Sequence, residues 1–298
     1  MFLPLPRVDL PQSAANIKQV IMSFKLVSQS VLGNPGNKHQ LFSRSFRAIA
    51  WQAQKRLLRS RKILTLASGA KFMAHPDCVV SSSLIYADWP EFHELQFIRS
   101  HLRESDVVLD VGANVGHVSL LLSDIVGWKN LFAFEPTPLT YARLVDNWKL
   151  NGSTSENLYH MAVGSEAGEV AIPDVKNPNT VNSILSNKEG VATVIVQVRP
   201  LDDLRERWKA QVGFMKIDVE GYEPQVFAGA TGLLQEDRPR LIMFESLDGA
   251  PPREVSETLS KAGYRIFQLD KTGRPDFTRQ EAQNLFATPV ELMSRFTE

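Results

Sequence analysis

The chain has 298 residues, in which 33 Lys and Arg residues balance 33 Asp and Glu residues. This length accommodates one catalytic domain and an extension. Because the net charge is zero, no global basic field exists, and we expect no nucleic-acid partner. The single cysteine, Cys78, excludes internal disulfides and fits a cytoplasmic setting. No uncharged apolar run of ~18 residues is present, so we expect no stable membrane insertion.

Residues 1–90 are predicted to form a mainly helical extension that contacts substrate or packs in a homodimer. Helical periodicity covers Ile17–Leu32 and His39–Arg61. The second of these segments is basic, which indicates a solvated face or a contact with an acidic substrate. Short strands are expected at Ile63–Leu66, Ala70–Ala74 and Val79–Tyr86.

Residues 91–298 are predicted to form an α/β domain. After a helix at Pro90–Leu102, strands alternate with helices, which predicts a doubly wound, mostly parallel, Rossmann-like sheet with helices on both faces. The expected strands are Val107–Val111, Leu131–Glu135, Leu158–Val163, Gly213–Val219, Arg240–Glu245, Tyr264–Leu269 and Asn284–Leu292. The expected helices are Val115–Val126, Leu139–Leu150, Pro224–Ala230 and Pro252–Ala262. Two further strands, Gly168–Ile172 and Thr193–Val198, flank a long polar segment, 176–190, that we expect to be a lid or a binding loop.

The segment from Val107 to His117 predicts a nucleotide-binding elbow. Asp110 ends a buried strand, and Gly112 and Gly116 permit a tight turn into the next helix. Such a turn places backbone N–H groups beside a ligand. Glu135 ends the following strand, where a carboxylate can accept hydrogen bonds from a ribose diol.

Asn114 occupies the place of the middle glycine that admits the pyrophosphate of nicotinamide cofactors. A cofactor without a pyrophosphate is therefore favoured, and S-adenosylmethionine is one. A nicotinamide-dependent oxidoreductase is the disfavoured alternative, and a binding protein that has lost its chemistry is a third.

Three segments, LDVGANVGHVSL, FEPTP and FMKIDVEGYEPQVFAGA, closely resemble the FkbM family of S-adenosylmethionine-dependent methyltransferases. The resemblance covers roughly residues 91–267. It implies the class I methyltransferase sheet with a reversed final strand. It also implies methyl transfer to a hydroxyl group of a sugar or secondary metabolite, with an amide or amine nitrogen as the alternative acceptor. The cofactor-binding residues that it implies are Asp110, Gly112, Asn114, Gly116, Glu135, Pro136, Ala162 and Asp218.

Candidate catalytic residues gather in Lys216–Gly221. Strand alternation is expected to place Lys216, Asp218 and Glu220 on one side, at the sheet edge where ligands bind. Asp218 is the first choice for the base that assists an in-line displacement, and Glu220 is the second. Lys216 would orient a carboxylate, or would act as a base if burial lowered its pKa. A structural pairing of the lysine with a carboxylate is the competing interpretation.

Further candidates surround this segment. His117 opens the helix after the elbow, and is either a base or an exposed first-turn histidine. Glu245 ends a neighbouring strand and is expected to contact the acceptor. No metal is assigned, although Asp218, Glu220 and Glu245 offer the oxygen ligands that suit Mg²⁺ or Ca²⁺. The resemblance places Asn182 and Ser183 at the substrate, and Tyr222 either borders the pocket or packs in the core.

Overall fold

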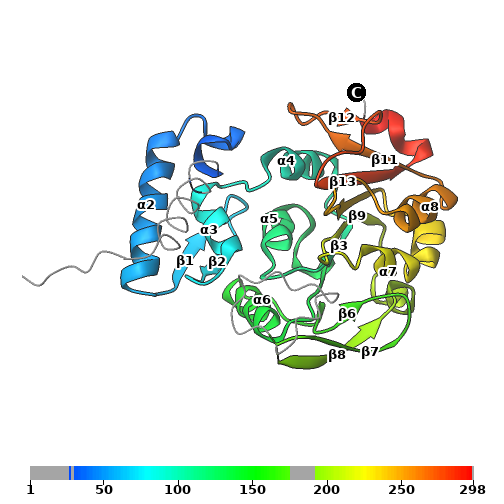
Figure 1. Cartoon of the computed structure of the whole chain (residues 1–298), viewed down its shortest axis with the longest axis horizontal. Coiled ribbons are helices and arrows are strands. Elements are labelled where there is room, and N and C mark those ends of the chain that lie inside the picture. Colours follow the sequence, from blue (N-terminus) through cyan, green and yellow to red (C-terminus); the bar gives the residue numbers. More distant parts are fainter. Residues whose placement is uncertain (1–26, 28–29, 175–191, 297–298) are drawn as a thin grey trace, which may run out of the picture.

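The computed structural model describes residue 27, residues 30–174 and residues 192–296. An eight-stranded sheet forms its centre, with helices on both faces and an N-terminal layer at one side (Figure 1). In spatial order the strands are β12 (Pro275–Asp276), β11 (Tyr264–Leu269), β13 (Asn284–Pro289), β10 (Leu241–Glu245), β9 (Val212–Ile217), β3 (Val107–Val111), β4 (Leu131–Phe134) and β5 (Leu158–Tyr159).

The sheet is mostly parallel, as the alternation of strands and helices predicts. Strands β10, β9, β3, β4 and β5 pair in parallel. Strand β13 runs antiparallel to both of its neighbours, β10 and β11. The structure thus confirms the class I methyltransferase sheet with its reversed final strand.

Continuous apolar runs form the central strands because both faces of the sheet are covered. Every residue of β3, β4 and β9 is buried. One face packs against α4 (Phe92–His101), α5 (His117–Val126) and α6 (Pro138–Leu150). The other face packs against α7 (Glu223–Ala228), α8 (Arg253–Lys261) and the short helical turns η3 (Leu201–Arg207) and η4 (Leu233–Asp237).

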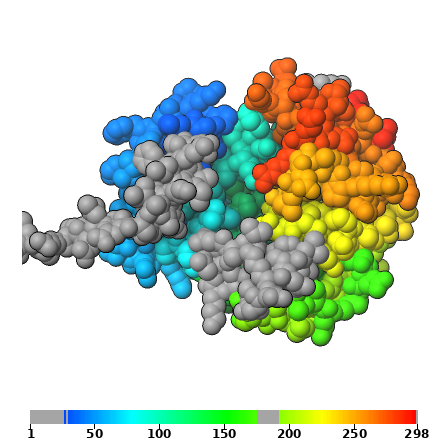
Figure 2. All heavy atoms as spheres, viewed as in Figure 1, coloured from blue at the N-terminus to red at the C-terminus, as the bar shows by residue number. Residues whose placement is uncertain are grey.

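The N-terminal layer contains η1 (Pro35–Asn37), α2 (Leu41–Leu57), β1 (Lys62–Thr65), β2 (Lys71–Ala74) and α3 (Val79–Tyr86). Its buried residues, Trp51 and Phe72 among them, belong to the same apolar cluster as the residues of α5 and α6. The Asn147 side chain of α6 accepts a hydrogen bond from the Met73 backbone N–H at 2.8 Å. The extension and the sheet domain therefore share one core, and the blue and cyan atoms of the layer abut the rest of the molecule in Figure 2. The division at residue 90 stays a proposal.

Two predicted strands are wrong. Val79–Tyr86 is helix α3, since eight residues rich in apolar and β-branched side chains do not distinguish a buried helix from a strand. Its Ser82 hydroxyl accepts a hydrogen bond from the Trp51 indole of α2 at 3.1 Å. The predicted strand Leu158–Val163 breaks at His160, whose exposed ring stacks on Tyr141 at 4.6 Å.

The second half of that strand belongs to another sheet. Strand β6 (Ala162–Val163) pairs with β8 (Thr193–Arg199), which pairs with β7 (Gly168–Pro173). Two other strands end early. Strand β9 stops at Ile217 rather than Val219, and β13 stops at Pro289, where a short helical turn, η5 (Val290–Phe296), follows.

Two predicted segments fall outside the described residues. These are nearly all of the predicted helix Ile17–Leu32 and the whole polar segment 176–190. In the part of the chain that the structure describes, none of the helices has the length and apolar character needed to cross a membrane.

Gly112 cannot be replaced without displacing the backbone at the sheet edge. It has φ +75°, and an added Cβ would lie 1.8 Å from the Asp218 carbonyl oxygen. We expect Gly112→Ala to lower the free energy of unfolding by more than ~3 kcal/mol, measured by urea denaturation.

The matched control is Gly69→Ala. Gly69 has φ +83° with no atom within 4 Å of an added Cβ, so only backbone strain of ~1–2 kcal/mol is expected. Equal losses in the two variants would show that the close approach of Gly112 to Asp218 is unimportant.

Candidate active site

A cavity of about 700 Å³ opens at the carboxyl ends of β3, β4 and β9. This size lies within the range of about 300–1,000 Å³ that is usual for ligand pockets. Its floor comes from the sheet edge and its opposite wall from the N-terminal layer. The lining residues from the sheet domain include Gly112, Asn114, His117, Glu135, Pro136, Thr137, Ala162, Asp218 and Glu220.

The elbow after β3 is fixed by backbone hydrogen bonds to its neighbours. The N–H groups of Gly112 and Ala113 donate to the Phe134 carbonyl at 3.0 and 2.9 Å. The Asp218 N–H donates to the Val111 carbonyl at 3.0 Å. These contacts tie the turn to both β4 and β9, so the elbow is a rigid platform beside the cavity.

Glu135 clamps the elbow from the end of β4. One carboxylate oxygen accepts a hydrogen bond from the Asn114 N–H at 3.0 Å, and the other accepts one from the Thr137 N–H at 2.8 Å. Burial raises the pKa of Glu135, and these hydrogen bonds oppose that rise. Asn114 itself has φ +53°, a left-handed conformation that asparagine tolerates better than most residues.

Six of the eight predicted cofactor residues line the cavity: Gly112, Asn114, Glu135, Pro136, Ala162 and Asp218. Asp110 and Gly116 do not. Asp110 is fully buried, and its Oδ2 accepts a hydrogen bond from the Ser119 hydroxyl at 2.6 Å. Gly116 allows α5 to pack closely, because an added Cβ would lie 2.5 Å from Leu144. The structure gives both residues positions that support the elbow.

Lys216 is a buried cation between two carboxylates. Its side chain is 3% exposed, with Nζ 3.0 Å from Asp218 Oδ2 and 3.8 Å from Asp110 Oδ1. Burial alone would lower the pKa of Lys216, but the Asp218 and Asp110 carboxylates raise it above its usual value. A lysine base needs a lowered pKa, so the structure opposes that role and favours a pairing role.

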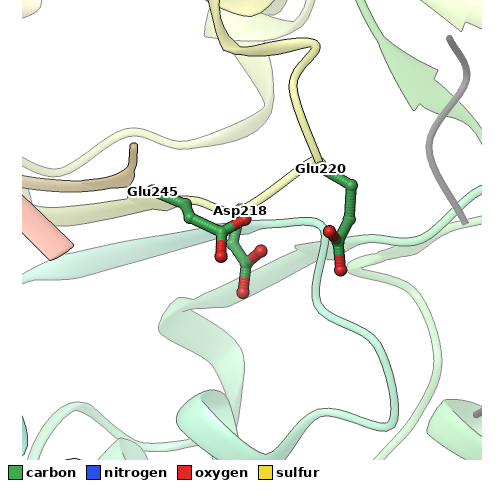
Figure 3. Close-up of side chains that lie close together, drawn as sticks. All are labelled: Asp218, Glu220 and Glu245. Atoms are coloured by element: carbon green, nitrogen blue, oxygen red, sulfur yellow. The ribbon is translucent and has the colours of Figure 1, made fainter. Parts of the chain in front are cut away.

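Asp218, Glu220 and Glu245 come together although β9 ends before Asp218. Each offers a carboxylate oxygen, and these oxygens all lie within 4.8 Å of one another (Figure 3). The chain leaves the strand after Ile217, and Glu220 has φ +54°, so a turn brings the side chains together where strand alternation was expected to do so.

The three carboxyl groups differ in proton affinity. Burial alone would raise the pKa of Asp218, but the Lys216 ammonium and its hydrogen bond bring it below the ordinary value. Burial raises the pKa of Glu245 to about 7, and the adjacent Asp218 and Glu220 charges add to that effect against a hydrogen bond from Gln283. Asp218 is therefore ionised at neutral pH, whereas Glu245 gains a proton as the pH falls through about 7.

His117 is less exposed than a first-turn histidine usually is. Its Nδ1 is buried and has no hydrogen-bond partner in the described part of the chain. Burial and the Lys216 charge lower the pKa of His117 to about 4. The imidazole is therefore neutral at physiological pH and lines the cavity with Asp218.

Sequence reasoning expected the N-terminal extension to contact substrate but named none of the residues that form its wall, which include Asn34, Val79 and Val80. Glu91 is its charged member. It occupies the N-cap position of α4 with φ +51°, and its side chain makes no capping hydrogen bond. Instead the carboxylate borders the cavity and bonds to the Asn284 side chain. The residue as a whole is exposed, and desolvation of the carboxylate where it faces the protein raises its pKa. None of the three sequence segments that carry the resemblance includes this residue.

Two predicted substrate residues of the described chain do not line this cavity. Glu245 does not line the cavity and stands behind Asp218, where it accepts a hydrogen bond from Gln283 at 2.9 Å. Tyr222 borders a smaller pocket beside β7, next to Gly164. Asn182 and Ser183 lie outside the described residues.

The mostly parallel sheet, its reversed strand and the glycine elbow define a class I methyltransferase fold. Residues 110–266, more than half of the chain, match the family model for the methyltransferase FkbM domain. The chain therefore belongs to the FkbM family of methyltransferases, as the three sequence segments predict.

The chain is also similar to individual proteins. The hexuronic acid methyltransferase AglP of Haloferax volcanii is 29% identical over 193 residues, which are 64% of this chain and 76% of that protein. A methyltransferase FkbM structure from Methylobacillus flagellatus aligns with 92% of this chain at 14% identity and a TM-score of 0.42. This chain covers only 60% of that protein. M. jannaschii TYW2, solved with AdoMet, aligns with 77% of this chain and 84% of its own at 14% identity and a TM-score of 0.40.

Lys216→Met removes the cation that two buried carboxylates share. We expect a loss of about 3 kcal/mol in the free energy of unfolding at neutral pH. This value is at the low end of the usual range for breaking a buried ion pair, because the Asp218 side chain is 39% exposed at the cavity. A carboxylate with a lowered pKa stabilises the fold above its unfolded pKa, and this contribution is lost in acid. The difference in the free energy of unfolding between the variant and the wild type should therefore become smaller below about pH 4.

Urea denaturation at both pH values measures that difference. The control is Lys149→Met on the exposed side of α6, which should change stability by less than ~0.5 kcal/mol. The pairing role would be contradicted if Lys216→Met were as stable as the wild type, or if the difference in stability became larger in acid.

Proposed function

We propose that this protein transfers a methyl group from S-adenosylmethionine to a hydroxyl oxygen of a sugar or related small molecule. One observation carries the proposal: the rigid elbow and the Glu135 carboxylate share a single cavity with Asp218, His117 and Glu91. Cofactor-binding and proton-accepting groups therefore face one another across a space of ligand size. The resemblance to a hexuronic acid methyltransferase supports a sugar acceptor.

The donor would lie over the ends of β3 and β4. Each Glu135 oxygen retains acceptor capacity beyond its one backbone hydrogen bond, so the carboxylate can still receive ribose hydroxyls. Gly112 and Asn114 would hold the methionine end, and Pro136 and Ala162 would border the adenine. Asp110 and Gly116 would act indirectly, by fixing the elbow.

The acceptor would enter between the sheet edge and the N-terminal wall, with Glu91, His117 and Asp218 around its reactive hydroxyl. S-Adenosylmethionine supplies an activated methyl carbon, so the chain mainly aligns the acceptor, excludes water and removes a proton. Asp218 is ionised and would receive the acceptor proton while the new carbon–oxygen bond forms and the carbon–sulfur bond breaks. Lys216 would hold Asp218 in place rather than act as a base.

The three clustered carboxylates need no metal in this proposal. Lys216 already neutralises Asp218 at 3.0 Å, and Glu245 carries a proton up to pH about 7. A divalent cation would have to displace the Lys216 ammonium from Asp218 and the proton from Glu245. We therefore assign the cluster to proton transfer, with a small-molecule or glycosidic substrate as the partner.

Glu135→Gln should weaken S-adenosylhomocysteine binding by about 10- to 100-fold, because a hydrogen bond to a charged group contributes about 1.5–3 kcal/mol. Isothermal titration calorimetry measures the affinity, and thermal unfolding checks that the elbow is intact. Glu156→Gln, an exposed residue of the loop before β5, is the control and should bind as wild type does.

Failure of the wild-type protein to bind S-adenosylhomocysteine would defeat the proposal. Binding of NAD in its place would favour the oxidoreductase alternative.

Activity should rise with pH through about 7, the pKa of Glu245. Below that pH, protonated Glu245 donates a hydrogen bond to Asp218 and makes Asp218 a weaker base. Because the two groups are coupled, the apparent pKa belongs to the pair. Glu245→Gln keeps a neutral donor at every pH, so the rise should disappear from the profile of kcat/KM. The assay follows methyl transfer to a hexuronate glycoside, with Glu156→Gln again as control. A Glu245→Gln profile identical to that of the wild type would exclude the pair as the proton acceptor.

A further inference from the structure

An apolar stripe runs along the outer side of α2. Phe42 is 90% exposed, Phe46 67%, Ile49 66% and Leu57 81%. Their spacing places them on one face of the helix. The opposite face carries the buried residues Arg44, Ala48 and Trp51, so α2 is anchored to the protein by one side and presents the stripe on the other.

The stripe continues past the helix end and is joined there by basic residues. Leu58 is 72% exposed and Ile63 52%. Between and beside them lie four exposed basic side chains: Arg56, Arg59, Arg61 and Lys62. We call these residues together with the stripe the α2 surface. Figures 1 and 2 show α2 at the end of the molecule away from the sheet.

The charge around the α2 surface is one-sided. The sequence from Leu10 to Pro76 holds eleven Lys and Arg residues and no Asp or Glu, although the whole chain is neutral. In the described part of this segment, Arg44 and Arg47 form ion pairs, both with Asp88. The exposed basic residues at the end of α2 are therefore available to an anionic partner.

These features fit one occupant best. A second copy of the chain would bring like charges together around the stripe, at a cost in free energy. Nucleic acid would neutralise the basic residues but would leave the phenylalanines in water. The surface of an anionic bilayer satisfies both, because apolar side chains enter the acyl boundary while Lys and Arg meet lipid phosphates.

We propose that the α2 surface binds the interface of anionic membranes, with α2 lying in the plane of the bilayer. The helix has 17 residues and is held to the protein on its other face, so it binds at the surface and does not span. The same N-terminal layer supplies Val79 and Val80 to the wall of the cavity. Membrane binding therefore fixes the orientation of the cavity relative to the lipid, whatever the acceptor is.

The test is co-sedimentation of the full chain with vesicles of phosphatidylcholine alone and with vesicles that also contain phosphatidylglycerol. The wild type should bind the anionic vesicles, more weakly as salt is raised. Phe42→Ser with Phe46→Ser should weaken binding at least about tenfold. Arg59→Glu with Arg61→Glu should weaken it about fivefold or more per charge.

Matched controls change similar residues elsewhere: Leu247→Ser with Val290→Ser for the apolar pair, and Lys129→Glu with Lys149→Glu for the charged pair. Both should bind vesicles as the wild type does. S-Adenosylhomocysteine binding by each variant reports folding and tests the proposed function separately. If the serine pair does not fold, the arginine pair decides the outcome.

Three results would overturn the proposal. One is equal binding to neutral and anionic vesicles, and another is unchanged binding in both α2 variants. The third is a wild-type dimer, seen by light scattering, that the serine pair dissociates while neither protein binds vesicles. That result would assign the α2 surface to a contact between two copies.

Discussion

A single buried ammonium organises the sheet edge on which the site is built. Lys216 projects from β9 toward Asp110 of β3 and Asp218 beyond its own strand, so three segments of chain meet at one charge. Removing a cation from water is costly unless carboxylates surround it. The same charge keeps Asp218 ionised, and burial together with this charge keeps His117 neutral. The ion pairs that hold the sheet edge together therefore also influence the protonation of the side chains in the cavity.

The sheet edge alone forms only half of the cavity. The other half is a wall carried by the N-terminal layer, which is held in place by contacts with the start of α4. The Asn34 side chain donates a hydrogen bond to the Trp89 carbonyl at 2.8 Å, and Gly36 lies so close to Phe92 that an added Cβ would be 2.6 Å away. These contacts hold Glu91 in a left-handed conformation that costs free energy and that turns its carboxylate toward the cavity.

The sequence predicts the sheet domain well because its signals are local. Buried strands are apolar runs, turns carry glycine, and Glu135 and Asp218 follow their strands directly. The N-terminal extension was expected to contact substrate, but the residues that face the cavity were not predicted, because Glu91 and Asn34 acquire their positions only through contacts between distant segments. Asp110 shows the opposite difference between sequence and structure. Its place in a motif suggested a cofactor contact, whereas full burial and the Ser119 hydrogen bond give it a supporting position. The sequence of Val79–Tyr86 does not distinguish a strand from a helix. Packing against the neighbouring helix α2 selects the helix.

The shared core of the N-terminal layer and the sheet domain limits how this enzyme can be divided. Trp51 and Phe72 lie in one apolar cluster with Leu120 and Trp148, and the backbone of β2 is hydrogen-bonded to α6. A fragment beginning at residue 91 would present the outer side of α5 and α6 to water and would lack a wall of its own cavity. Chimaeras that aim to change acceptor preference must therefore exchange the first 90 residues together with the helices beneath them, as a single cassette.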